Sequence, residues 1–328
     1  MSRIPLEQIG FYTLSDDRCK TASSSSRLMR GEVVLTDACN FKCPYCRGQR
    51  NDLRKTLSQT EATYIVSLFA DHHLKNIRFS GGEPTCWKGL AKLVEYTRRR
   101  GIDRIALSTN GSATLETYKE LIDCGVNDFS ISLDACCSQF GDKMAGVAGV
   151  WDKVVSNIAQ LSKLTYLTVG VVVTPETVPQ LKGTIEFADS LGVSDIRIIS
   201  AAQYNEVLSV VREVPQTILD KYPILKYRVT NAINGINVRG IEEKDSKRCW
   251  IGLDDVAVAG DYHYPCIIYL REQGNPIGRV GPHMRRAREE WVHKHNAKED
   301  PICKKNCLDC IVQYNRDYRD FRGIVENA

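Results

Sequence analysis

The sequence has no long apolar segment and little excess of charge of either sign. None of its hydrophobic runs approaches the roughly 20 residues that a helix needs to cross a bilayer. The first ten residues also lack the apolar centre of a signal peptide. Lys and Arg number 44 against 40 Asp and Glu, which leaves a net charge of +4. The basic runs 98–104 and 284–288 are therefore interpreted as solvated helix faces, and a nucleic-acid partner is not favoured.

Cysteine, in contrast, is abundant. The chain has 13 cysteines in 328 residues, and six of them form two clusters with the spacing C-x3-C-x2-C. This usage is typical of metal binding in a reducing cytoplasm and not of a disulfide framework. With 43% hydrophobic residues, the chain can bury one large core or two smaller ones.

Short β-branched runs alternate with amphipathic stretches from residue 32 onward, a pattern that indicates repeated βα units. The expected strands are 32–36, 76–80, 104–108, 128–133, 166–173 and 195–200, and the expected helices are 59–72, 87–100, 115–124, 150–161 and 179–191. Because parallel connections are right-handed, six such units predict an α/β fold with a partial (β/α)6 TIM-like barrel. Sequence motifs follow the first four strands directly, where parallel barrels carry their chemistry.

The pattern changes near residue 235. The stretch 254–270 reads as a hairpin that turns at Gly260 and Asp261, and a basic helix is expected over 284–296. We therefore divide the chain into an N-terminal extension (1–28), the barrel (29–235) and a small C-terminal α+β domain (236–328).

A cysteine hook is the most informative motif. Cys39, Cys43 and Cys46 lie within eight residues, with Tyr45 between the last two. Three thiolates can hold three irons of a cubane and leave the fourth iron open. The alternative is a zinc knuckle, but no cysteine supplies a second pair between Cys46 and Cys86. The sequence RFSGGEP, residues 78–84, follows one βα unit later.

The hook and the glycine motif, in this order and spacing, resemble the radical S-adenosylmethionine (radical SAM) superfamily. The resemblance implies a [4Fe-4S] cluster whose open iron chelates the amino nitrogen and carboxylate of S-adenosylmethionine. One electron then breaks the sulfur–C5′ bond, and the resulting 5′-deoxyadenosyl radical removes a substrate hydrogen. The implied partners are a small-molecule or peptide substrate and an electron donor of the flavodoxin or ferredoxin type.

The same resemblance implies the cofactor-binding residues, which are Tyr45, Gly81, Gly82, Glu83, Pro84, Thr109, Asn110 and Ser132. The two glycines lack a Cβ, so their backbone can approach the ligand closely and adopt conformations barred to other residues. Glu83 can accept a hydrogen bond from the ammonium group, and Pro84 stiffens the end of the turn. For Thr109, Asn110 and Ser132, which match contacts to the ribose or carboxylate, the alternative is a turn-forming or capping role.

Three further residues after the fourth strand are candidate catalytic groups. Asp134 could face the substrate. Cys136 or Cys137 could donate a hydrogen atom to a substrate radical and so complete an epimerisation. Ordinary structural thiols are the alternative.

A second constellation closes the chain. Cys249 precedes the hairpin and Cys266 lies on its second arm, while Cys303, Cys307 and Cys310 follow near the C-terminus. With PIGRVG (276–281) and Trp291 between them, these cysteines resemble a SPASM or twitch domain. The resemblance implies one closed auxiliary [4Fe-4S] cluster held by Cys249, Cys266, Cys307 and Cys310, with Cys303 as the alternate. Such a cluster suits electron transfer, and zinc is the alternative metal.

The predicted activity is oxidation or epimerisation of a small polar metabolite, such as a sugar, aminoglycoside or nucleoside. Only 38 residues precede the hook, too few for a peptide-recognition domain. The alternatives are a peptide-modifying maturase, a nucleic-acid modification enzyme and a non-catalytic zinc- or iron-binding scaffold. Molybdopterin-precursor synthesis also uses two clusters, but it is set aside because the chain ends in GIVENA, without that family's glycine pair.

Overall fold

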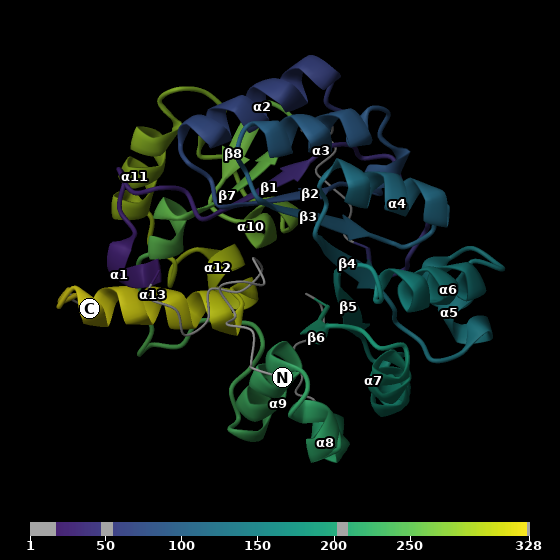
Figure 1. The fold of residues 1–328 in the computed structure, drawn as a ribbon. Helices are drawn as coiled ribbons and strands as arrows, with labels where there is room; N and C mark the ends of the chain where they lie inside the picture. Colours follow the sequence, from purple (N-terminus) through teal and green to yellow (C-terminus); the bar gives the residue numbers. More distant parts are fainter. Residues whose placement is uncertain (1–17, 47–54, 202–208, 327–328) are drawn as a thin grey trace.

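A curved sheet of nine strands organises the chain in the computed structural model, which describes residues 18–46, 55–201 and 209–326 (Figure 1). The strand order is β6-β5-β4-β3-β2-β1-β7-β8-β9. Strands β1 to β6 are parallel, β7 joins β1 in parallel, and β8 and β9 continue in antiparallel order. Residues 1–17 of the predicted N-terminal extension lie outside the described ranges.

The elements have the following bounds. The strands are β1 Arg30–Val34, β2 Asn76–Ser80, β3 Arg104–Thr109, β4 Asp128–Ser132, β5 Tyr166–Val173, β6 Asp195–Ser200, β7 Asp255–Ala259, β8 Tyr262–Tyr264 and β9 Gly278–Arg279. The helices are α1 Arg18–Thr21, α2 Gln59–Asp71, α3 Leu90–Arg99, α4 Leu115–Cys124, α5 Ser138–Ala145, α6 Trp151–Leu161, α7 Leu181–Ser190, α8 Gln216–Leu219, α9 Pro223–Ile233, α10 Ile267–Arg271, α11 Met284–Lys294, α12 Pro301–Asn306 and α13 Asp309–Phe321. Short 3-10 turns are η2 Pro84–Cys86, η3 Val178–Gln180, η4 Ser209–Glu213 and η5 Trp250–Leu253.

The predicted α/β fold with a mostly parallel sheet is confirmed. All six expected barrel strands form, and three of them (β2, β5 and β6) have the predicted ends. The helices after them wrap the outer face of the sheet, as Figure 1 shows for α2 to α7. This arrangement brings the loops after β1, β2, β3 and β4 to one rim of the barrel.

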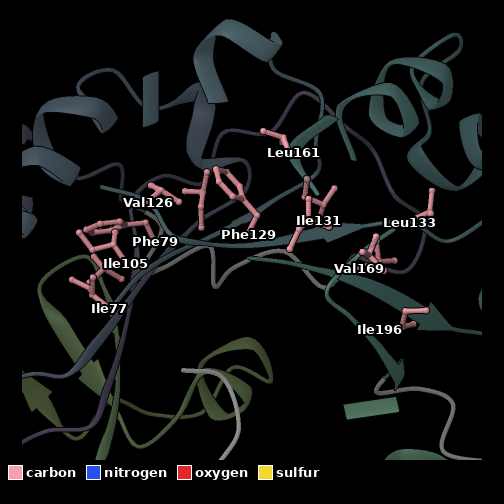
Figure 2. Packing of buried hydrophobic residues seen from close by; sticks show 14 of the residues in the cluster. Ile77, Phe79, Ile105, Val126, Phe129, Ile131, Leu133, Leu161, Val169 and Ile196 are labelled. Carbon is pink, nitrogen blue, oxygen red and sulfur yellow. The ribbon is translucent and has the colours of Figure 1, made fainter. Parts of the chain in front are cut away.

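Alternate side chains of the strands point outward and build the main core. Figure 2 shows Phe79, Phe129 and Ile131 packed together under the helices. The Tyr118 ring of α4 meets the Phe129 ring edge-on, with 5.7 Å between centroids. Full burial of each such side chain contributes roughly 1.5–3 kcal/mol, which is enough to fix the strands and therefore the rim.

The predicted hairpin differs from the structure in its second arm. Strand β8 ends at Tyr264, and Cys266 is the residue before α10, so the prediction that Cys266 lies on the hairpin is wrong. Because β7 pairs with β1, the hairpin also extends the barrel sheet instead of starting a sheet of its own. The domain boundary near residue 235 stays a prediction.

Three helices within the predicted barrel range, α5, α8 and α9, were not expected from the sequence. Helix α5 follows the loop after β4, where only α6 was predicted. No helix within the described ranges is long and apolar enough to cross a membrane.

Candidate functional site

The hook lies in the loop after β1 and is held in place by α5. Cys39 and Cys46 are exposed and Cys43 is half-buried. The Lys42 N–H donates to the Ala145 carbonyl at the end of α5, at 2.8 Å. Gly146 follows with a φ of +66°, and a Cβ there would collide with the Lys42 carbonyl oxygen. Helix α5, which the sequence did not predict, therefore positions the cysteine loop.

The glycine motif packs against the start of the same loop. The Gly82 N–H donates to Thr36 O at 2.7 Å, and the Glu83 N–H donates to Ala38 O at 2.8 Å. A Cβ on Gly81 would lie 2.6 Å from Thr36 O. Neither glycine of the motif has a positive φ, so the prediction that they adopt conformations barred to other residues is wrong. Their missing Cβ atoms allow the two loops to touch.

Glu83 joins the loops after β2 and β3. Its carboxylate accepts hydrogen bonds from the Thr109 hydroxyl (2.7 Å), from the Asn110 N–H (2.7 Å) and from both donors of Thr85 (2.7 and 3.0 Å). The side chain is fully buried, and this burial raises its pKa despite the four bonds. Glu83 is also the N-cap of the turn that begins at Pro84. Its predicted bond to the ammonium group stays a prediction.

Two asparagines connect the hook to the loop after β3. Asn110 donates through Nδ2 to Asn40 Oδ1, and Asn40 donates through Nδ2 to Ser112 Oγ, both at 2.8 Å. Sequence reasoning missed Asn40 and Ser112. The signal was an asparagine beside Cys39 and a serine directly after the Asn-Gly turn.

Tyr45 and Asp134 link the hook to the carboxyl ends of β4 and β5. The Tyr45 hydroxyl donates to Asp134 Oδ2, and the Val172 N–H donates to Asp134 Oδ1 at 2.7 Å. Burial raises the Asp134 pKa to about 6, while these two hydrogen bonds oppose the shift. Asp134 therefore contacts the hook, whereas Ser132 is exposed on the inner face of the rim.

The two cysteines after β4 lie in different surroundings. Cys136 is half-buried against α7, where a Cβ on Gly183 would lie 3.5 Å from its sulfur. Cys137 is exposed and precedes the first turn of α5. A hydrogen-donating role for either thiol stays a prediction.

The auxiliary cysteines converge in two adjoining packed clusters. Cys249, Cys307 and Cys310 are buried in one of them, and Cys266 and Cys303 pack against the other. Burial raises the pKa of the Cys307 thiol far above its usual value. The charges of Cys249, Cys266 and Cys310 add to this shift. Bare thiolates are therefore strongly disfavoured here, and a bound metal cation would offset that cost. The sulfur-only donor set fits an iron–sulfur cluster.

A mixed set of ligands surrounds the alternate cysteine. The ligand atoms of His295, Asp300 and Cys303 lie within 4.8 Å of one another, and His295 Nε2 is 3.5 Å from the Cys303 sulfur. Asp300 is also the N-cap of α12, which accounts for its position without a metal. The zinc alternative thus keeps its best support at Cys303, since zinc accepts sulfur, nitrogen and oxygen ligands together.

The hook, the glycine motif and the rim loops occupy residues that also match a family model. Residues 33–188 match the model described as the Radical SAM superfamily. The chain contains a radical SAM domain. It is a radical SAM enzyme, and its cofactors are a [4Fe-4S] cluster and S-adenosylmethionine. The three hook cysteines fit the cluster, since they offer three thiols that are exposed or half-buried.

Curated relatives agree with this assignment. A "Probable GTP 3',8-cyclase" of Sulfurisphaera tokodaii is 23% identical over 255 residues, which cover 74% of this radical SAM enzyme and 81% of the relative. Two further relatives of that name align over about half (54%) of their own length. The "Molybdenum cofactor biosynthesis protein moc-5" of Caenorhabditis elegans is 34% identical over 37% of this chain and 21% of its own.

A solved structure has a similar fold over most of the chain. The structure of anSMEcpe with bound AdoMet has a TM-score of 0.57 and 16% identity, over 90% of this chain and 93% of that one. At this identity the likeness concerns the fold alone. The SPASM or twitch resemblance of residues 236–328 stays a prediction.

Proposed function

We propose that this radical SAM enzyme removes a hydrogen atom from a small anionic metabolite of the nucleotide class. The sequence predicts a sugar, an aminoglycoside or a nucleoside as substrate. Of these we keep the nucleoside, in its phosphorylated form. When bound, the cluster and S-adenosylmethionine supply the radical that takes the hydrogen. The observation that carries the proposal is the position of Arg197 on the inner face of the barrel, beside Gly170.

Arg197 lies across this inner face beside the predicted site. It pairs in register with Gly170 of β5, which in turn pairs with Ser132 of β4. A Cβ on Gly170 would lie 3.3 Å from Arg197 Nη2, so the glycine leaves room for the guanidinium group. The exposed Ser132 hydroxyl is on the neighbouring strand at the same level. Together they offer a charged and a neutral donor to a substrate.

Arg197 is one of three arginines that act on the same buried carboxylate. Arg78, Arg104 and Arg197 all act on the buried carboxylate of Asp128, whose pKa is raised by burial and lowered by these three groups. Arg78 makes the ion pair, at 3.4 Å. A guanidinium group matches phosphate geometry well, which supports an anionic ligand at this face.

The relatives support the same class. The printed name of the Sulfurisphaera tokodaii protein describes a GTP cyclase, which acts on a nucleotide. The Caenorhabditis elegans relative is named for molybdenum cofactor biosynthesis. Molybdopterin-precursor synthesis, which was not favoured from the sequence, is therefore again a candidate. The reaction outcome proposed here is therefore rearrangement or ring closure before oxidation or epimerisation, and a peptide-modifying maturase is not favoured.

The remaining residue roles are proposals of the same kind. Cys39, Cys43 and Cys46 hold the open cluster, and Tyr45, Glu83, Thr109, Asn110 and Ser132 shape the cosubstrate site. Four of the five cysteines of residues 236–328 hold the auxiliary cluster. Asp134 positions Tyr45.

The test is anaerobic turnover with a panel of nucleotides. Reconstituted protein, S-adenosylmethionine and dithionite are incubated with GTP, other nucleoside triphosphates, free nucleosides and sugars, and the products are identified by mass spectrometry. A phosphate-bearing nucleotide should be consumed, and deuterium on its ribose should appear in 5′-deoxyadenosine. Arg197→Gln should lose this turnover but keep uncoupled cleavage, whereas Arg99→Gln, at an exposed position, should keep both. Cleavage with no nucleotide consumed would refute the substrate class and leave the radical chemistry standing.

A further inference from the structure

The guanidinium group of Arg288 is fully buried on α11 between the two segments that carry Cys249 and Cys266. Its Nε donates to Gly252 O at 2.8 Å, in the turn that begins after Cys249. Its Nη2 donates to Pro265 O at 3.3 Å, directly before Cys266. One side chain thus bridges both predicted ligand segments.

All hydrogen-bond partners of this guanidinium are neutral. Besides Gly252 and Pro265, they are the carbonyl oxygens of Tyr264 and Asp255 and the Nδ1 atom of His263. Burial first, and then the charge of Arg288, lowers the His263 pKa to about 3, so the imidazole is neutral near pH 7. A buried cation without an anionic partner is very costly.

The nearest carboxylates are already engaged by other arginines. Asp255 pairs with Arg30 at 2.9 Å, and Asp254 pairs with Arg18 at 2.8 Å. Within the described ranges no carboxylate lies at ion-pair distance from Arg288. The groups whose negative charge stabilises the Arg288 cation are Asp255, which lies beyond ion-pair distance, and then Cys249 and Cys266 as thiolates.

We propose that Arg288 is a buried counter-charge of the auxiliary cluster and raises its reduction potential. A cubane held by four thiolates carries net negative charge, and reduction by one electron makes that charge larger. A fixed cation beside two of the ligands therefore stabilises the reduced cluster more than the oxidised one. The inference rests on the proposed auxiliary cluster and is independent of the substrate.

The residue also suits this role by its chemistry. A guanidinium stays protonated when burial lowers its pKa, here to about 10, whereas a buried lysine loses its charge more readily. Its planar fork can bond several carbonyl groups at once while keeping its charge near the sulfur atoms.

The test compares potentials in the full chain with Cys39, Cys43 and Cys46 replaced by Ala, which leaves the auxiliary cluster alone. Iron is counted first, because a parent without a cluster would refute the basis of the inference and not the proposed substrate. The midpoint potential is then followed by electron paramagnetic resonance for Arg288→Gln and Arg288→Lys. The Gln variant should have a more negative midpoint, and the Lys variant should stay near the parent.

Arg285 supplies the matched control. It lies one turn earlier on α11, is 9% exposed, and also bonds carbonyl groups, namely those of Ser23, Ser24, Ser26 and Leu253. Its charge partners are Asp254 and Glu289, with no cysteine among them. Arg285→Gln should therefore keep the parent midpoint.

Each remaining outcome decides the proposal. Loss of iron in Arg288→Gln with retention in Arg288→Lys would support a counter-charge. An unchanged midpoint in an iron-loaded Gln variant would overturn the proposal. Equal shifts of the midpoint in Arg288→Gln and Arg288→Lys would also overturn it, and so would the same shift in Arg285→Gln. Loss of iron in both Arg288 variants would overturn it as well, because it would show that Arg288 has a purely structural role.

Discussion

The hydroxyl of Tyr45 donates a hydrogen bond to the buried carboxylate of Asp134, and so ties the cysteine hook to the rim of the barrel. The second oxygen of Asp134 is held by the Val172 N–H at 2.7 Å. The loop that carries the three proposed cluster ligands is therefore oriented by the end of β4 and by β5. The bond between Tyr45 and Asp134 forms without a metal, although Tyr45 also interacts with the Cys43 thiol, so it can be tested in the cluster-free protein.

The first prediction concerns this link. Tyr45→Phe leaves an acceptor of Asp134 unsatisfied, and Asp134→Asn weakens the same bond, so each should lower the free energy of unfolding by about 1–3 kcal/mol. In the double variant the losses should fall short of their sum by about 1 kcal/mol, because both remove one interaction. Urea unfolding of the cluster-free protein measures this cycle, with Tyr64→Phe, at a half-exposed position, as the control. Strictly additive losses would show that the bond contributes nothing.

The second prediction concerns Glu83. Replacement by Ala leaves the Thr109 hydroxyl and the Asn110 N–H without their acceptor, which should cost about 3 kcal/mol and loosen the loop after β3. The dissociation constant of S-adenosylmethionine should rise while the cluster spectrum stays intact. Glu83→Gln keeps one acceptor oxygen in place and should lose less on both counts. An unchanged dissociation constant in Glu83→Ala would remove Glu83 from the cosubstrate site.

The barrel could be predicted from the sequence because its strands are buried and bounded by turn residues. In β5, the apolar run ends at Val173, and Pro175 follows soon after, so pattern and structure agree. The motif cysteines and glycines were placed correctly at the rim, because parallel strands end on the same side. The order of these motifs along the chain was enough to predict their placement at the rim.

The unpredicted features depend on contacts between distant residues. Helix α5 contains Gly141, which weakens it locally, but the Trp151 ring packs so closely there that a Cβ would not fit. The sequence CIIYL continues the apolar pattern of β8, yet it is buried as a helix, and periodicity alone does not separate the two. Glu83 was assigned to the ligand because two of its four protein donors, on Thr109 and Asn110, are brought to it only by the fold.

The third prediction is a pH dependence at Asp195, a fully buried residue that accepts from the N–H groups of Ile196 (2.8 Å) and Ile224 (3.2 Å). Burial raises its pKa from 3.8 to about 7 despite these bonds. Between those values the folded protein holds a proton that the unfolded chain has lost, so stability falls as the pH rises through 7.

The difference in unfolding free energy between the parent and Asp195→Asn measures this effect. The parent should lose about 3 kcal/mol relative to the variant between about pH 5 and pH 8. Denaturant unfolding at four or five pH values gives the curve, and Asp220→Asn, at an exposed position, serves as the control. A constant difference across this range would show that Asp195 is ionised in the folded protein throughout.

The fourth prediction separates the two clusters. Reconstituted protein should hold about eight irons, and replacement of Cys39, Cys43 and Cys46 by Ala should leave about four. Replacement of Cys249 and Cys266 by Ala removes ligands of the auxiliary site while the hook, Glu83 and the rim network stay intact. Uncoupled cleavage of S-adenosylmethionine should therefore survive in that variant, while turnover of the true substrate falls. The fall should be larger for a net oxidation than for a rearrangement, since only the former needs an electron acceptor.

Because β7 and α10 flank these cysteines, the melting transition and the iron count are measured on the same sample. A folded four-iron variant with the parent's turnover would make the auxiliary site structural.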